Sequence, residues 1–132
     1  MSTLALATLR NLAGTASTSS DNVINGCAKA WVNFSATSGV TTINASYNVS
    51  SVTYVSTGIY TMNFTTAFAD NKYSWSASSG FSSVAGTTFV SAPPSTAIST
   101  WKTTTALRVA SCTSNNTPTT PNSDDVSIMV LR

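Results

Sequence analysis

From residue 28 onward, apolar and polar residues alternate in short runs, and a period of two predicts β-strands. The first run, residues 28–34, places small and large apolar residues on one face and Trp31 on the other. The last run, residues 126–131, is apolar on both faces, because Met129 and Leu131 lie opposite a set of branched residues. We therefore expect either a subunit interface at Trp31, Met129 and Leu131 or a sandwich that buries both faces of these strands within one chain.

Further alternating runs separate these two strands. They cover residues 43–49, 52–55, 59–64, 73–77, 88–91 and 107–111. Ser56-Thr57-Gly58 is typical of a three-residue hairpin loop, because Gly supplies the positive φ. Residues 113–125 contain two prolines and predict an exposed loop. About seven or eight short strands at this spacing predict an all-β protein, an antiparallel β-sandwich of a jelly-roll-like kind.

Residues 1–26 have a different pattern. Their leucines, Leu4, Leu6, Leu9 and Leu12, follow neither a helical nor a strand period, and residues 13–26 are polar and rich in Gly and Ser. We predict an extended N-terminal arm over 1–26 and a sandwich domain over 27–132. The arm lacks a basic start and Arg10 interrupts its apolar stretch, so we expect neither a signal peptide nor insertion into a membrane.

The composition supports a β-protein and excludes several functions. Ser and Thr make up roughly a third of the chain, whereas Glu, Gln and His are absent. The chain has six basic and four acidic residues, and the basic ones are scattered, which argues against nucleic-acid binding. A surface with so little charge favours association between copies.

The same composition leaves little room for catalysis. Without His or Glu, neither a Ser-His-Asp constellation nor a His-rich zinc site can form. Asp124 and Asp125 are adjacent, so on a strand they point to opposite faces, and Asp21 and Asp70 fit solvated turns. We expect no enzyme activity, no metal site and no cofactor.

Aromatic residues beside Ser- and Gly-rich stretches suggest a ligand surface. The candidates are Tyr73, Trp75, Phe81 and Trp101, since an aromatic ring can face the apolar side of a sugar while small polar groups bind its hydroxyls. Alternatively, Tyr73 and Trp75 fill the core, as their alternation with polar neighbours suggests. Phe81 and Trp101 lie in less regular segments and are the better surface candidates.

Cys27 and Cys112 are the only cysteines, and one pair is not a disulfide framework. We expect two reduced, buried thiols, because a free cysteine behaves as a small apolar residue.

Three segments stand out: KAWVNF at 29–34, ASYNVSSVT at 45–53 and GIYTMNFTTAFADNKYSW at 58–75. Together they resemble a small domain of bacteriophage tail-fibre and related virion proteins, common in tailed phages of marine bacteria. The resemblance covers roughly residues 26–132. It implies a homotrimeric β-sandwich displayed at the virion surface and assembled in the bacterial cytoplasm, whose reducing conditions would keep the cysteines unlinked.

In long fibres such a domain ends a large protein, whereas here it makes up nearly all of the chain. We therefore expect the leucines of residues 1–26 to anchor the protein to other virion proteins. The function expected from the resemblance is a trimeric fibre or a tail or capsid appendage that contacts host surface glycan. The alternatives are a purely structural decoration or adaptor of head or tail, and a secreted lectin or adhesin.

Overall fold

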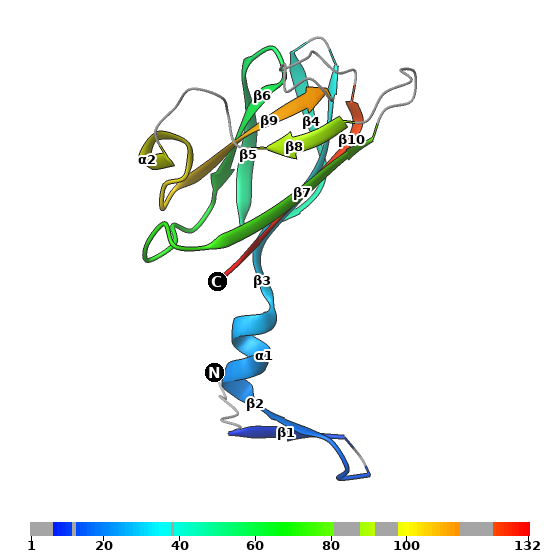
Figure 1. Cartoon of the computed structure of the whole chain (residues 1–132), viewed down its shortest axis with the longest axis vertical. Helices are drawn as coiled ribbons and strands as arrows, with labels where there is room; N and C mark the ends of the chain where they lie inside the picture. Colours follow the sequence, from blue (N-terminus) through cyan, green and yellow to red (C-terminus); the bar gives the residue numbers. More distant parts are fainter. Residues whose placement is uncertain (1–6, 12, 38, 81–87, 92–97, 114–122) are drawn as a thin grey trace.

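Two four-stranded antiparallel sheets form a sandwich in the computed structural model, which describes residues 7–11, 13–37, 39–80, 88–91, 98–113 and 123–132 (Figure 1). The first sheet has the spatial order β4 (Val40–Tyr47), β3 (Ala28–Thr37), β10 (Ser123–Leu131) and β7 (Ser74–Gly80). The second sheet has the order β5 (Val49–Ser56), β6 (Ile59–Phe64), β9 (Ala106–Thr113) and β8 (Thr88–Ser91). The prediction of an all-β antiparallel sandwich is thus confirmed.

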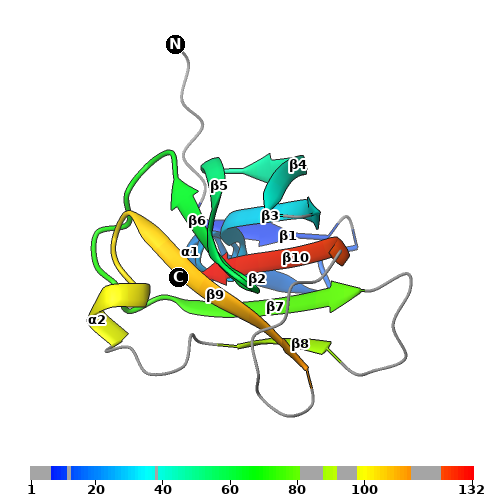
Figure 2. The same cartoon turned by 90° about the horizontal axis from the view of Figure 1, so that it is seen from above.

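The prediction of a jelly-roll-like connectivity is wrong. Three pairs of consecutive strands, β3–β4, β5–β6 and β8–β9, each lie side by side in one sheet. In a jelly roll most consecutive strands belong to opposite sheets. Seen from above, β9 crosses obliquely over β10 and β7 of the other layer (Figure 2).

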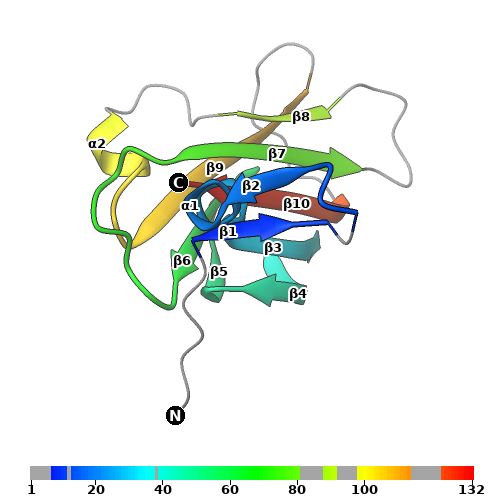
Figure 3. The same ribbon diagram turned by 90° about the horizontal axis from the view of Figure 1, so that it is seen from below.

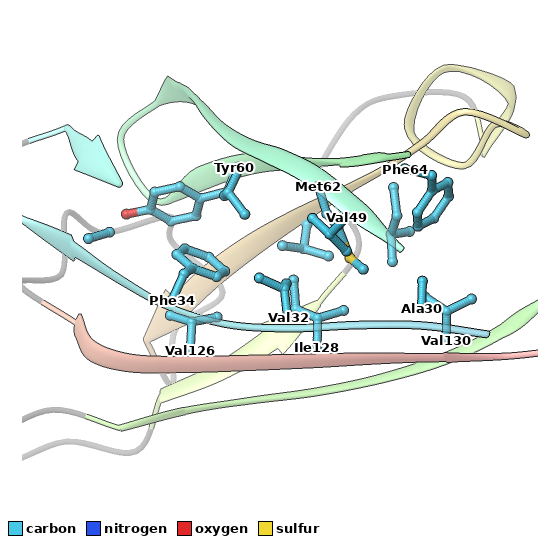
Figure 4. Close-up of a cluster of buried hydrophobic side chains, with 14 of the residues drawn as sticks. Ala30, Val32, Phe34, Val49, Tyr60, Met62, Phe64, Val126, Ile128 and Val130 are labelled. Carbon is cyan, nitrogen blue, oxygen red and sulfur yellow. The ribbon is translucent and has the colours of Figure 1, made fainter. Parts of the chain in front are cut away.

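The core lies between the sheets and follows the alternation of the strands. Val32 and Phe34 of β3 and Ile128 of β10 point towards Tyr60 and Met62 of β6 (Figure 4). Burying each such side chain contributes about 1.5–3 kcal/mol relative to leaving it exposed. The predicted core faces of residues 28–34 and 126–131 are therefore confirmed, and β10 pairs with strands on both sides.

One predicted strand, residues 43–49, is divided between the two sheets. Asn48 has a φ of 54°, and this left-handed residue turns the chain from β4 into β5. A bulge between Asn33 and Phe34 adds a residue to β4, so Ile43 packs against the core whereas Tyr47 faces solvent. The predicted hairpin between β5 and β6 is confirmed, with Gly58 at a φ of 69°. The predicted three-residue loop is wrong, because Ser56 belongs to β5 and pairs with Ile59, which leaves Thr57-Gly58 as the loop.

Three elements of regular structure precede β3, where the sequence predicts an extended arm. β1 (Thr8–Arg10) pairs with β2 (Ser17–Ser19), and α1 (Ser20–Gly26) follows directly. The Ser19 hydroxyl accepts a hydrogen bond from the Asn22 N–H at 3.2 Å and caps this helix. These elements lie at one end of the sandwich, away from the core (Figures 1 and 3).

A second short helix, α2 (Ile98–Trp101), precedes β9. Within the part of the chain that the structure describes, no helix is long and apolar enough to cross a membrane.

Candidate functional site

A row of exposed apolar side chains crosses the outer face of the first sheet. Trp31 of β3 pairs with Tyr47 of β4 on one side and with Met129 of β10 on the other. Their exposed fractions are 38% for Trp31, 58% for Tyr47 and 42% for Met129. These three residues are called the Trp31 row below. All three are exposed in the single chain, so the alternative of a sandwich that buries both faces within one chain is wrong at Trp31 and Met129.

Beside the Trp31 row lies a network of polar side chains. The Asn33 amide donates to the Ser127 hydroxyl at 3.0 Å and to a carboxylate oxygen of Asp125. Its carbonyl oxygen accepts from the Asn44 amide at 2.8 Å. Asn33 is therefore held in one orientation by groups from two neighbouring strands.

A shallow hollow of about 310 Å³ is lined both by Asn33 and Ser127 of this network and by two members of the Trp31 row. Trp31 and Met129 border it, and the small side chains of Ser76 and Ser78 on β7 leave it open. No charged residue lines it. A neutral hollow beside apolar side chains suits close contact with another uncharged surface.

The outer face of the second sheet is different. There the Asn63 amide donates to the hydroxyls of Ser51 and Thr53 at 2.9 and 3.0 Å. Arg108 donates to the Thr61 hydroxyl at 3.3 Å. This polar face satisfies its own hydrogen bonds, so the first sheet is the better candidate for contact with a partner.

A larger open pocket of about 760 Å³ lies at the end of the sandwich nearest α1, where β3 begins and the C-terminus lies (Figure 1). We call it the basal pocket. Four separate segments line it: the start of β3, the β4–β5 corner, the loop after β6 and the residue after β10. Its lining residues are Lys29, Tyr47, Asn48, Thr65, Thr66, Ala67, Phe68, Ala69 and Arg132.

Two cations belong to the basal pocket, and each has a partner. The Lys29 ammonium donates to the Ile24 carbonyl of α1. Arg132 forms an ion pair with Asp70, with 2.7 Å between the Arg132 Nη2 and Asp70 Oδ2 atoms. Both ends of that pair are more than a third exposed, so solvent screens it.

The predicted ligand-binding aromatics do not form one surface. Tyr73 is only 1% exposed, and its hydroxyl donates to the carbonyls of Thr103 and Ala106 at 3.0 and 3.2 Å. The prediction that Tyr73 contacts a ligand is therefore wrong, because its ring completes the core. Burial raises the pKa of Tyr73 to about 12.

Trp75 and Trp101 are partly buried and pack edge to face, with ring centroids 6.1 Å apart, against the same core. A ring held in that way offers only part of its surface to a ligand. Phe81 lies outside the described residues.

The predicted interface and anchor residues have separate positions. Leu131 is half-buried and is less accessible than Trp31 or Met129. Leu9 is exposed on β1, whereas Leu4, Leu6 and Leu12 lie outside the described residues.

The two cysteines also differ in accessibility. Cys27 is exposed just before β3, which corrects the prediction that both thiols are buried, and Cys112 is buried in β9. Among the described residues, no group of three or more Cys, Asp or Glu side chains is placed to hold a metal ion.

Sequence reasoning missed Tyr47 and both cations of the basal pocket. Tyr47 has the same parity as Ile43 in the alternating run of residues 43–49, so the pattern alone does not single it out, and Lys29 and Arg132 are more than a hundred residues apart in sequence. Only the strand order, with β3 beside β10, brings the two cations to the same end of the molecule.

Comparison with known proteins found no match to this chain among the family models, the curated proteins or the solved structures.

Proposed function

We propose that this chain is a structural protein of a bacteriophage virion, a trimeric fibre or a tail or capsid appendage that contacts glycan on the host cell. The observation that carries the proposal is the Trp31 row, an exposed apolar row in the middle of a sheet face whose hollow has no charged lining. Trp, Tyr and Met are enriched at the centres of protein interfaces, and charged residues are depleted there.

The low charge of this surface supports the proposed self-association. A face that carries net charge repels its own copy, whereas two neutral faces meet without that cost. The Trp31 row supports the predicted roles of Trp31 and Met129 at a subunit interface. Leu131, being half-buried, has a smaller part in it.

A structural decoration or adaptor without a receptor role is the second candidate. It is favoured by the apolar side chains of Leu9, Val23 and Ile24, which are exposed on β1 and α1, away from the Trp31 row. Two separate apolar surfaces fit a protein that connects two other components.

Two measurements test the proposal. Light scattering on the purified full chain gives its oligomeric state, for which we expect a trimer at micromolar concentration. Mass spectrometry and electron cryo-microscopy of intact particles from the phage that encodes it give its location. A distal, exposed copy supports host contact, a copy clamped between virion proteins supports the adaptor, and absence from the particle overturns both.

A further inference from the structure

We infer that the basal pocket binds an acidic saccharide, with the sugar carboxylate held by Lys29 and Arg132. This inference rests on the glycan contact proposed above and names the class of sugar and the site. Of the predicted aromatic candidates, the three that the structure describes, Tyr73, Trp75 and Trp101, do not line this pocket.

The first argument is size and shape. A volume of about 760 Å³ lies within the range of about 300–1,000 Å³ that is usual for ligand pockets. The pocket is open, and Ala67 and Ala69 of the loop after β6 contribute only methyl groups to its lining. It can therefore admit one end of a chain of sugars.

The second argument is charge. Two of the six basic residues of the chain line this one pocket. The Ile24 carbonyl occupies one donor of the Lys29 ammonium, which keeps the charge in place and leaves two donors for a ligand. Arg132 uses one nitrogen for Asp70, and a guanidinium has five N–H donors in total.

The third argument is the remaining lining. Tyr47 lies on the edge strand β4, at the end of the Trp31 row, where its largely exposed ring also lines the pocket and suits the apolar side of a pyranose. Thr65 and Thr66 add two hydroxyls, each able to donate and to accept a hydrogen bond. Cations, hydroxyls and an aromatic ring together match a ligand that is at once anionic, polyhydroxylated and partly apolar.

A substitution at Asp70 tests the role of Arg132 in ligand binding. Its carboxylate competes with a ligand carboxylate for Arg132, since the two make the ion pair of 2.7 Å. Asp70 also accepts the Lys72 N–H through Oδ1 at 2.8 Å, and an amide oxygen can accept that same bond. Asp70→Asn therefore removes the competing charge and preserves the turn.

The test uses the full chain and two probes, trigalacturonate and its fully methyl-esterified form, measured by isothermal titration calorimetry. We expect the acid to bind at millimolar affinity or better, more weakly at higher salt, and the neutral ester to bind at least about tenfold more weakly. Lys29→Gln should weaken binding of the acid about fivefold, and Asp70→Asn should strengthen it about twofold to threefold.

Lys72→Gln is the matched control, because it removes the same charge from an exposed residue that does not line the pocket. Its affinity for trigalacturonate should equal that of the wild type. The inference is overturned if trigalacturonate does not bind at about 10 mM, or if the ester binds equally well. It is also overturned if Lys72→Gln weakens binding of trigalacturonate as much as Lys29→Gln does, or if Asp70→Asn fails to strengthen that binding. Failure here leaves the particle location and the oligomeric state untouched, so it is distinguishable from failure of the proposed function.

Discussion

Asn48 and Thr66 are joined by two hydrogen bonds between a side chain and a backbone. The Thr66 N–H donates to Asn48 Oδ1 at 2.7 Å, and Asn48 Nδ2 donates to the Thr66 carbonyl at 3.2 Å. Asn48 Nδ2 also donates to the Lys29 carbonyl at 3.2 Å. One amide thus ties β3 and the loop after β6 to the corner where the chain changes sheets.

Asn48→Ala should therefore lower the free energy of unfolding by about 2–3 kcal/mol. The change removes these hydrogen bonds. It also places an alanine, whose side chain cannot form a local hydrogen bond, at a φ of 54°, a backbone conformation that a Cβ makes unfavourable. Asn48→Gly loses the same bonds without the backbone strain, so it should be about 1 kcal/mol more stable than Asn48→Ala. Urea denaturation measures both, and equal stability of the two variants would contradict the role given to the backbone.

Met129→Asp should dissociate the oligomer while the sandwich stays folded. The side chain is already exposed in the single chain, so the new charge costs the fold little, whereas an unpaired charge within an interface is strongly unfavourable. We expect an apparent association constant at least about tenfold lower by light scattering.

The control for Met129→Asp is Val40→Asp, which adds the same charge at a side chain that is 67% exposed and outside the Trp31 row. It should leave the oligomer intact. Leu131→Asp is a less clean variant, because Leu131 is half-buried and its substitution also destabilises the fold. A wild-type protein that is already monomeric would exclude this interface.

The free energy of unfolding should fall at alkaline pH because Tyr73 is buried. Its pKa is about 12 in the folded protein and 10.0 when unperturbed, so the unfolded state loses the proton first as pH rises. The free energy of unfolding therefore falls between pH 10 and pH 12, by on the order of 2 kcal/mol for this residue.

Tyr73→Phe should lack that part of the pH dependence and should be about 1 kcal/mol less stable at pH 7, where the hydroxyl still donates. Tyr47→Phe is the control at an exposed position. Denaturant titrations across this pH range measure all three proteins, and identical slopes for wild type and Tyr73→Phe would refute the assignment.

Cys27 and Cys112 should react with a thiol reagent at different rates. Cys27 is exposed and should be labelled in the native protein, whereas Cys112 is buried and should be labelled only on unfolding. Mass spectrometry of the labelled protein distinguishes the two sites. An intact mass two hydrogens short under non-reducing denaturing conditions would show a disulfide and contradict the prediction of unlinked thiols.

Deletion of residues 1–22 should leave a folded sandwich that no longer enters particles. The core cluster of the described residues begins at Ala30, so the deletion removes none of its members. Circular dichroism and thermal melting test the fold, and mass spectrometry of purified particles tests incorporation. An unfolded product would place the N-terminal segment within the sandwich, and normal incorporation would place the anchor elsewhere.

The sequence predicts the core strands well because their alternation is uninterrupted. In β10, the residues Val126, Ile128 and Val130 face inward as expected, and Met129 faces out. The same reasoning fails at β4, where a one-residue bulge reverses which side chains face the core and exposes Tyr47. A bulge depends on the partner strand, so the pattern of one strand does not reveal it.

The candidate sites are less predictable than the fold. Trp31 stands out in the sequence because it interrupts a polar face, and the structure exposes it. The basal pocket has no such signal, because its lining combines four segments that no local motif connects. Tyr73 was a candidate both for a ligand and for the core, its alternation with polar neighbours favoured the core, and its packing in the structure places it there.

The middle of the first sheet is built from β3 and β10, strands that lie more than eighty residues apart in sequence. During synthesis on a ribosome, β3 emerges early and has only β4 to pair with until residues 123–131 follow. The first sheet therefore cannot close until β10 has emerged, and until then the exposed edge of β3 is open to pairing with a neighbouring nascent chain. Polysomes that synthesise several copies side by side would bring such edges together, so the yield of correctly folded protein should depend on how densely ribosomes load the message.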